Sequence, residues 1–311
     1  INDKGYLTNR LTEEAIAFID RNKSRPFFLY LAYNAVHAPP QAPKDDIEAY
    51  HRRFPDIGKE RQVLMAMLKH LDDGVGAVVA KLKREQLFDN TLLFFLTDNG
   101  GAKAMHADNT PLRGFKGSLT EGGIRTPFFV SWPAKFSGAR TVDTPVISLD
   151  ILPTAVAASG KLPAKDNFDG KSLLPLLTGE SQRHHDTLFW CKDGGEWAVR
   201  RGEWKLRSVK GETELFNLAD DPSEKRNLVD QHSQVVTMLS SAFDGWIRQM
   251  ADPITGGANR AQVEPAKPPL TEREKERLKK RLERKKQRDA EKKAGNKTTE
   301  NSAPADGHRE V

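Results

Sequence analysis

The sequence predicts an α/β fold with a central, mostly parallel sheet, followed by a small C-terminal antiparallel sheet with a packing helix. Helical patterns alternate with continuous apolar runs in the first part of the chain, which is typical of parallel strands covered on both faces. After Gly179 the pattern changes to short segments separated by turn residues, which favours antiparallel pairing. A chain of 311 residues with 37% hydrophobic residues is long enough to bury a sizeable core.

The first part of the chain repeats a helix-then-strand unit. A helix is expected at residues 12–22, with Thr12 as its cap, and the apolar run PFFLYLA at 26–32 follows as a buried strand. Apolar residues keep helical spacing across 64–82, and TLLFFLT at 91–97 follows as a second strand. This alternation indicates one α/β layer arrangement.

The later elements are shorter. A third strand is expected at 127–132 and a helix at about 148–159. The small sheet and its packing helix are expected at 187–190, 196–202, 203–209, 213–218 and 231–250. We therefore divide the chain into an α/β part (1–180), a C-terminal α+β subdomain (181–251), a Pro, Gly and Ala rich linker (252–270) and a charged tail (271–311).

The net charge of +6 is local to the tail. Residues 271–293 hold 12 Lys and Arg against 6 Asp and Glu, and the rest of the chain carries as many acidic as basic residues. With few large apolar side chains, the tail is expected to be a solvated helix or disordered. Charge runs of this kind are usually solvated, so we expect no nucleic-acid partner. A contact of the tail with nucleic acid or an acidic surface is the functional alternative.

Cysteine content and hydropathy exclude several other classes. The single cysteine, Cys191, excludes an internal disulfide framework and a multi-cysteine metal site. No run of 18 or more apolar residues exists, and residues 1–20 lack the order of a secretory signal, so no membrane partner is expected. The chain alone fixes neither its compartment nor its oligomeric state.

The first candidate site is the turn LTDNGG at 96–101. Asp98 and Asn99 follow directly on a predicted buried strand, and ligands of open α/β sheets bind at the carboxyl ends of strands. A carboxylate beside an amide carbonyl offers two hard oxygens that suit Ca²⁺ or Mg²⁺. A plain Asp-Asn-Gly turn is the alternative interpretation.

Two further candidates lie in loops expected at the same sheet edge. His37 follows the first predicted strand, where an imidazole can give a proton to a leaving oxygen. Lys116 lies between glycines in GFKGS and offers a compact charge for a sulfate or phosphate oxygen. An ordinary loop histidine is the alternative for His37, and for the flanking arginines, Arg113 and Arg125, we expect structural roles.

Six segments occur in the order found in type I, formylglycine-dependent sulfatases, and the chain resembles that arylsulfatase-like family over residues 5 to about 250. They are PFFLYLAYNAVHAPP, LDDGVG, NTLLFFLTDNGG, PLRGFKGSLTEGGIRTPFFVSWP, SLDILPT and ELFNLADDPSEKRNL. The resemblance implies part of an alkaline-phosphatase-like fold. It implies Ca²⁺ ligands at Asp98 and Asn99, with Mg²⁺ the second choice, a sulfate contact at Lys116, and contacts to sulfate and the leaving oxygen at His37.

The nucleophile motif of that family, Cys/Ser-x-Pro/Ala-x-Arg, is not found in the sequence. Cys191 is followed by Lys-Asp-Gly-Gly, and the motif that begins at Ser131, Ser-Trp-Pro-Ala-Lys, ends in Lys135. We therefore expect the chain to be the C-terminal portion of a larger enzyme, with the formylglycine and the other calcium ligands upstream. A family member that naturally lacks the nucleophile is the alternative.

The resemblance implies a sulfuric ester hydrolase in the intact protein, with an alkyl, aryl or carbohydrate sulfate as substrate. We expect this chain alone to be inactive, because Lys116 and His37 can only assist an attacking group. A phosphodiesterase or phosphatase of the same superfold and a non-catalytic sulfatase-like binding protein are the alternatives. Sulfated small molecules or glycans are the partners implied, and a periplasmic or secreted location is the family expectation.

Overall fold

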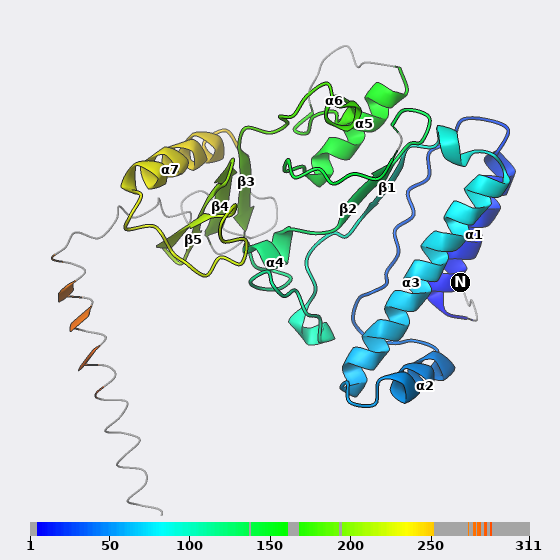
Figure 1. Ribbon diagram of the computed structural model, residues 1–311, viewed down its shortest axis with the longest axis horizontal. Coiled ribbons are helices and arrows are strands. Elements are labelled where there is room, and N and C mark those ends of the chain that lie inside the picture. The colour runs from blue at the N-terminus through cyan, green and yellow to red at the C-terminus, as the bar shows by residue number, and fades with distance from the viewer. Residues whose placement is uncertain are drawn as a thin grey trace, which may run out of the picture.

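The computed structural model describes residues 5–136, 138–160, 168–192 and 195–251, with single positions between Arg273 and Gln287. Figure 1 shows the N-terminal helices at one end, a small strand pair in the middle, and the C-terminal sheet with its helix at the other end. The expected linker at 252–270 lies outside the described residues. The described tail positions are helical and exposed, and the rest of 271–311 lies outside them too.

Helix α1 (Leu7–Asn22) packs along α3 (Lys59–Arg84), with α2 (Lys44–Arg53) against the N-terminal part of α3 (Figure 1). The expectation that Thr12 caps the first helix is wrong, because α1 begins at Leu7. Thr12 instead lies inside the helix, where its hydroxyl donates to the Thr8 carbonyl and contacts the Tyr33 hydroxyl at 2.9 Å. No helix among the described residues is long and apolar enough to cross a membrane.

The central pair is antiparallel, which corrects the predicted mostly parallel sheet. Strand β1 (Leu93–Leu96) pairs with β2 (Phe128–Ser131), with Leu93 opposite Ser131 and Leu96 opposite Phe128. No third strand joins this pair within the described ranges. The apolar runs identified the strands, but a continuous run does not specify strand direction, and here the chain returns along β1.

Residues 26–32 are not a strand, which corrects the expected first strand. The segment is extended, and alternate side chains face the body of the protein and the solvent. Phe27 packs edge-on against Phe18 of α1, whereas Phe28 and Tyr30 are 76% and 81% exposed. Only one face is therefore covered, and the described residues supply no neighbouring strand to pair with it.

Shorter elements flank the strand pair and lead from it to the C-terminal sheet. Helix α4 (Glu121–Ile124) precedes β2, and α5 (Ile151–Ala158) and α6 (Leu174–Thr178) follow it. Three short 3-10 turns complete this part: η1 (Phe88–Asn90), η2 (Lys103–Met105) and η3 (Ser148–Asp150). The turn η3 leads directly into α5, at the place where one longer helix was expected.

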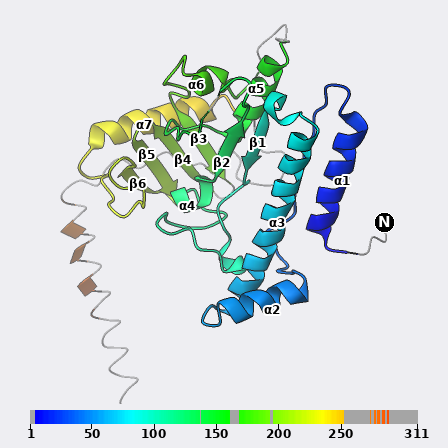
Figure 2. The same ribbon diagram turned by 45° about the vertical axis from the view of Figure 1, so that its right-hand side comes forward.

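The predicted C-terminal antiparallel sheet and packing helix are confirmed. Its strands lie in the order β3 (Leu188–Lys192), β4 (Glu196–Arg201), β5 (Trp204–Val209) and β6 (Glu212–Asn217). Helix α7 (Ser233–Ile247) covers one face (Figure 2). The core between them consists of Trp197, Val199, Leu206, Leu215, Val236, Leu239 and Phe243. Trp197 stacks on Phe243 with ring centroids 4.2 Å apart.

On the opposite face of β5, the side chain of Lys205 is completely buried between two carboxylates. Its ammonium lies 2.7 Å from Glu121 of α4 and 3.0 Å from Glu224, which follows β6. The second oxygen of Glu224 accepts the backbone N–H of Glu121 at 2.7 Å. This buried ion cluster joins the C-terminal sheet to the loop that contains Lys116.

We predict that Lys205→Met destabilises the protein by about 3–5 kcal/mol, because two buried carboxylates lose the cation between them. Urea denaturation would measure the loss. Lys225→Met is the matched control, because Lys225 is exposed one residue beyond the cluster and its loss should change stability little. Equal, small effects of the two substitutions would contradict a stabilising role for the cluster.

Candidate active site

The loop around Lys116 is folded tightly onto the turn after β1. The carbonyl oxygen of Gly101 accepts the backbone N–H of Lys116 at 3.1 Å, and Gly100 donates to the Gly123 carbonyl at 2.9 Å. A Cβ at Gly100 would collide with the carbonyl oxygen of Gly122. Glycine is therefore required there by the close approach of two backbones.

Gly114 is a second position of the loop that requires glycine. Its φ is +90°, and a Cβ there would collide with the Thr120 hydroxyl. The hydroxyls of Ser118 and Thr120 are hydrogen-bonded at 2.6 Å inside the same loop. The loop is thus a compact turn whose tip presents the Lys116 side chain to the solvent.

The structure brings Lys116 and His37 together although they are far apart in the sequence. The ammonium of Lys116 lies 3.0 Å from Nε2 of His37, and Nδ1 of His37 lies 2.9 Å from the carbonyl oxygen of Ala38. A carbonyl can only accept, so Nδ1 carries the proton and Nε2 presents its lone pair to the lysine. The imidazole is therefore oriented by one hydrogen bond and held near the cation by another.

Asp98 and Asn99 lie in the turn whose next residues hold the Lys116 backbone. Asp98 is exposed and Asn99 is half-buried. Within the described ranges, no hydrogen bond or ion pair joins either side chain to another residue. Their oxygens are available to a hard cation beside the Lys116 loop, and they can supply two of the six to eight ligands that Ca²⁺ takes. Their role as metal ligands stays a prediction.

Asn109 is a positioning residue that the sequence did not single out. Its side-chain oxygen accepts the Gly101 N–H at 3.0 Å, and its amide nitrogen donates to the carbonyls of Gly101 and Gly114, both at 3.0 Å. One amide therefore ties the Asp98–Asn99 turn to the Lys116 loop. The Asn-Thr-Pro run from 109 to 111 signals a turn, but nothing local predicts these distant partners.

The C-terminal sheet supports the loop from outside. Lys192 of β3 donates a hydrogen bond to the Gly117 carbonyl. Arg113 binds Glu214 of β6 at 3.1 Å and donates to the Glu224 carbonyl at 3.2 Å, so its expected structural role is confirmed. The site has a cation, an imidazole and hard oxygens without a partner in the described part of the chain, which suits the ester of a strong oxyanion.

Comparison with known proteins gives the family. The model described as "Sulfatase" matches residues 1–161, and the model "N-sulphoglucosamine sulphohydrolase, C-terminal" matches residues 115–246. The first match covers half of the chain, and the chain belongs to the sulfatase family.

Curated relatives extend beyond the matched region. Steryl-sulfatase of Mus musculus is 30% identical over 314 residues, which cover 87% of this chain and 47% of that protein. Arylsulfatase of Hemicentrotus pulcherrimus is 34% identical over 204 residues, 64% of this chain and 35% of the relative. The chain thus spans about half or less of the length of these relatives.

Solved structures share the fold. The crystal structure of "Ps i-CgsB" is 34% identical, has a TM-score of 0.72, and matches 79% of this chain and 56% of its own. The structure of BT4656 with D-glucosamine-2-N,6-O-disulfate has a TM-score of 0.64, with 80% of this chain and 71% of that chain covered. At 17% identity, it shows the fold alone. The predicted sulfatase-like α/β architecture is confirmed at this level.

We predict that Asn109→Ala loosens the contact between the turn and the Lys116 loop, because three backbone groups lose their partner. A loss of about 1–3 kcal/mol is expected in urea denaturation. Hydrogen exchange at the Gly101 amide should become faster. Asn90→Ala, at an exposed position before β1, is the control. An unchanged Gly101 exchange rate would show that Asn109 does not hold the turn.

Proposed function

We propose that this chain carries the sulfate-binding and leaving-group side of a sulfuric ester hydrolase. The observation that carries the proposal is the 3.0 Å contact of Lys116 and His37 beside the Asp98–Asn99 turn, in a chain of the sulfatase family. When an S–O ester bond is cleaved, a lysine and a cation held by paired hard oxygens can bind the sulfate, and an imidazole can give a proton to the leaving oxygen.

Lys116 binds a sulfate oxygen in this proposal. Its ammonium is exposed at the tip of a rigid loop, so a sulfate can reach it while the backbone stays fixed. A fixed positive charge stabilises the negative charge that grows on the departing group, without reorganisation of the loop. Removal of one such donor costs about 10²–10³ in turnover in enzymes where it has been measured.

His37 serves the leaving oxygen. Nδ1 of its imidazole is committed to the Ala38 carbonyl, so Nε2 is the atom that accepts or delivers a proton. Nε2 faces the Lys116 ammonium, which places proton donor and sulfate contact side by side. Proton delivery by a positioned side chain is worth about 10²–10⁴-fold, mostly for substrates whose leaving group is a poor one.

Asp98 and Asn99 fit part of a Ca²⁺ site, because their side chains lack partners in the described residues and offer hard oxygens. A formylglycine is proposed from a segment upstream of residue 1. When bound, Ca²⁺ would supply positive charge that binds the sulfate, and the formylglycine would supply the oxygen that attacks sulfur. The lengths of the curated relatives support a larger protein, since the matched region is 47% of one and 35% of another.

We propose that residues 1–180 belong to the catalytic domain and 181–251 form a subdomain that supports it. Phe28, Tyr30 and Phe129 are exposed aromatic side chains of the first part, which a further segment of the proposed larger protein would cover. The substrate is an alkyl, aryl or carbohydrate sulfate. Relatives named for steryl and aryl sulfates, and a structure with a neocarrahexaose, leave all three classes open.

We predict that the full-length protein hydrolyses an aryl sulfate in the presence of Ca²⁺. Lys116→Ala should raise KM and lower kcat by about 100-fold or more, because substrate and transition state both lose a charge contact. His37→Ala should lower kcat mainly for alkyl sulfates, whose leaving oxygen needs the proton more. Kinetics with an aryl and an alkyl substrate would separate the two effects.

Lys103→Ala, an exposed lysine in η2, is the control and should keep full activity. Residues 1–311 alone should hydrolyse nothing, because positioning and charge do not supply an attacking group. Turnover by residues 1–311 that disappears in Lys116→Ala would overturn the need for an upstream nucleophile. Cleavage of phosphate esters but not of sulfates would favour a phosphatase instead.

A further inference from the structure

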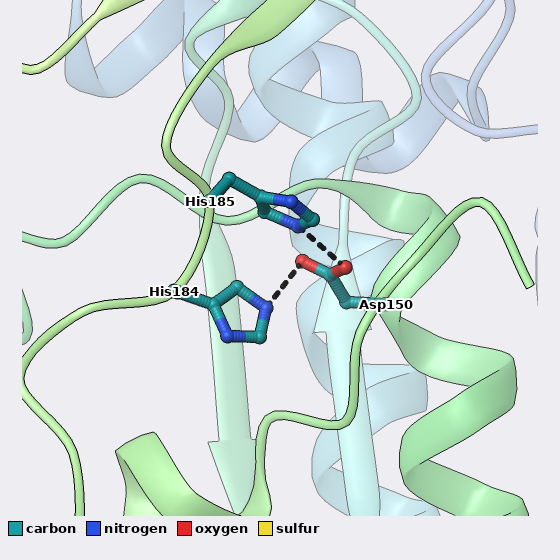
Figure 3. Close-up of side chains that lie close together, drawn as sticks. All are labelled: Asp150, His184 and His185. Carbon is teal, nitrogen blue, oxygen red and sulfur yellow. Dashed lines mark hydrogen bonds and ion pairs between the residues drawn. The ribbon is translucent and has the colours of Figure 1, made fainter.

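A second group of ionisable side chains lies in a buried cluster at Asp150, which ends η3, and at His184 and His185, which precede β3. Figure 3 shows both imidazole rings directed at the Asp150 carboxylate. The Asp150 side chain is 0% exposed, and those of His184 and His185 are 5% and 7% exposed. No step of the proposed hydrolysis uses these residues, so their burial needs a separate explanation.

The backbone fixes the carboxylate before either histidine is considered. The N–H of Ile147 donates to Oδ2 of Asp150 at 2.9 Å, and the N–H of Lys171 donates to Oδ1 at 2.8 Å. Each oxygen keeps a further lone pair, and one imidazole nitrogen lies close to each oxygen. An oriented, hydrogen-bonded carboxylate of this kind is typical of metal ligands in proteins.

The two histidines meet the carboxylate differently. Nε2 of His185 is hydrogen-bonded to Oδ1 at 2.8 Å. Nε2 of His184 is 3.1 Å from Oδ2, but the angles do not fit a hydrogen bond, and this buried nitrogen has no hydrogen-bond partner among the described residues. A buried polar atom without a partner costs about 1–3 kcal/mol, so a further group is expected between the rings and the carboxylate.

We propose that Asp150, His184 and His185 bind one divalent transition-metal ion, with Zn²⁺ as the best fit. One carboxylate oxygen and one ring nitrogen of each histidine lie within 4.8 Å of one another. Ligand bonds of about 2.0–2.2 Å from each atom to a central ion are compatible with that spacing after small side-chain shifts. Two imidazole nitrogens with one oxygen select Zn²⁺ over Ca²⁺ or Mg²⁺, which take oxygen ligands.

The position of the site defines its role. Asp150 immediately precedes helix α5 in the α/β part, whereas the histidines lie on the segment that enters the C-terminal sheet. A metal ion bound there cross-links these two segments, which are more than 30 residues apart in the sequence. The site is therefore structural, and it does not depend on the proposed hydrolysis.

The test is a titration of the chelator-treated full-length protein with Zn²⁺, with Ca²⁺ in excess to occupy sites made of oxygen ligands. Bound zinc is measured by elemental analysis and its effect by the melting temperature. His184→Gln and His185→Gln keep a donor that can reach the carboxylate but provide a poor zinc ligand. His70→Gln is the matched control, since His70 also lies against a carboxylate, 2.9 Å from Asp46, without a second imidazole.

We expect one tightly bound zinc per chain, and a higher melting temperature with zinc, in the wild type and His70→Gln. In His184→Gln and His185→Gln the affinity should fall by more than the roughly 10–100-fold that loss of an outer-shell partner costs. Equal zinc binding in all four proteins, or none in the folded wild type, would leave only a hydrogen-bonded cluster and overturn the proposal. If both glutamine variants fail to fold, the wild type is titrated with Co²⁺ and its visible absorption spectrum is recorded. Absence of the bands of four-coordinate cobalt would overturn the proposal.

Discussion

The ion cluster of Lys205, Glu121 and Glu224 is the interaction on which the rest of the arrangement depends. Its cation comes from the central part of the C-terminal sheet, and one of its carboxylates comes from the helix that follows the Lys116 loop. A buried charge without a partner is far more costly than an imperfect apolar contact, so the two parts can pack well in few relative positions. The cluster thereby fixes where the loop lies. The desolvation free energy of the buried charges is offset by their pairing with one another and by the hydrogen bond from the Glu121 N–H to Glu224.

Close backbone packing transmits this constraint to the site. Because Gly100 allows the turn after β1 to touch the backbone of Gly122, a shift of α4 would also move the Asp98–Asn99 turn. Asn109 adds hydrogen bonds from the turn to the Lys116 loop. The exposed side chains of the site are thus held in place by the packed backbone beneath them. They can therefore stay oriented although they are not buried themselves.

The sequence predicted those elements whose pattern is local. Strands β3 to β6 and α7 fall close to their expected ranges, because alternating side chains and turns define short antiparallel strands without distant information. The segment 26–32 was mistaken for a strand, since an apolar run does not state which partner it pairs with. Lys205 and Asn109 gave no signal, because a lysine in a strand normally faces solvent and the partners of both residues lie in other elements.

The sequence placed Lys116 and His37 near each other only through two separate motifs and the order of those motifs in the family. The structure adds which nitrogen of His37 meets the lysine. The lysine must donate to Nε2, because Nδ1 is already bound to the Ala38 carbonyl. A protonated Nε2 would bring two positive groups into contact, and a bound sulfate would relieve that repulsion because it lies between them as an anion. In the proposed function, anion binding at Lys116 and proton delivery by His37 are therefore linked by charge alone, because one sulfate would contact both the ammonium and the imidazole.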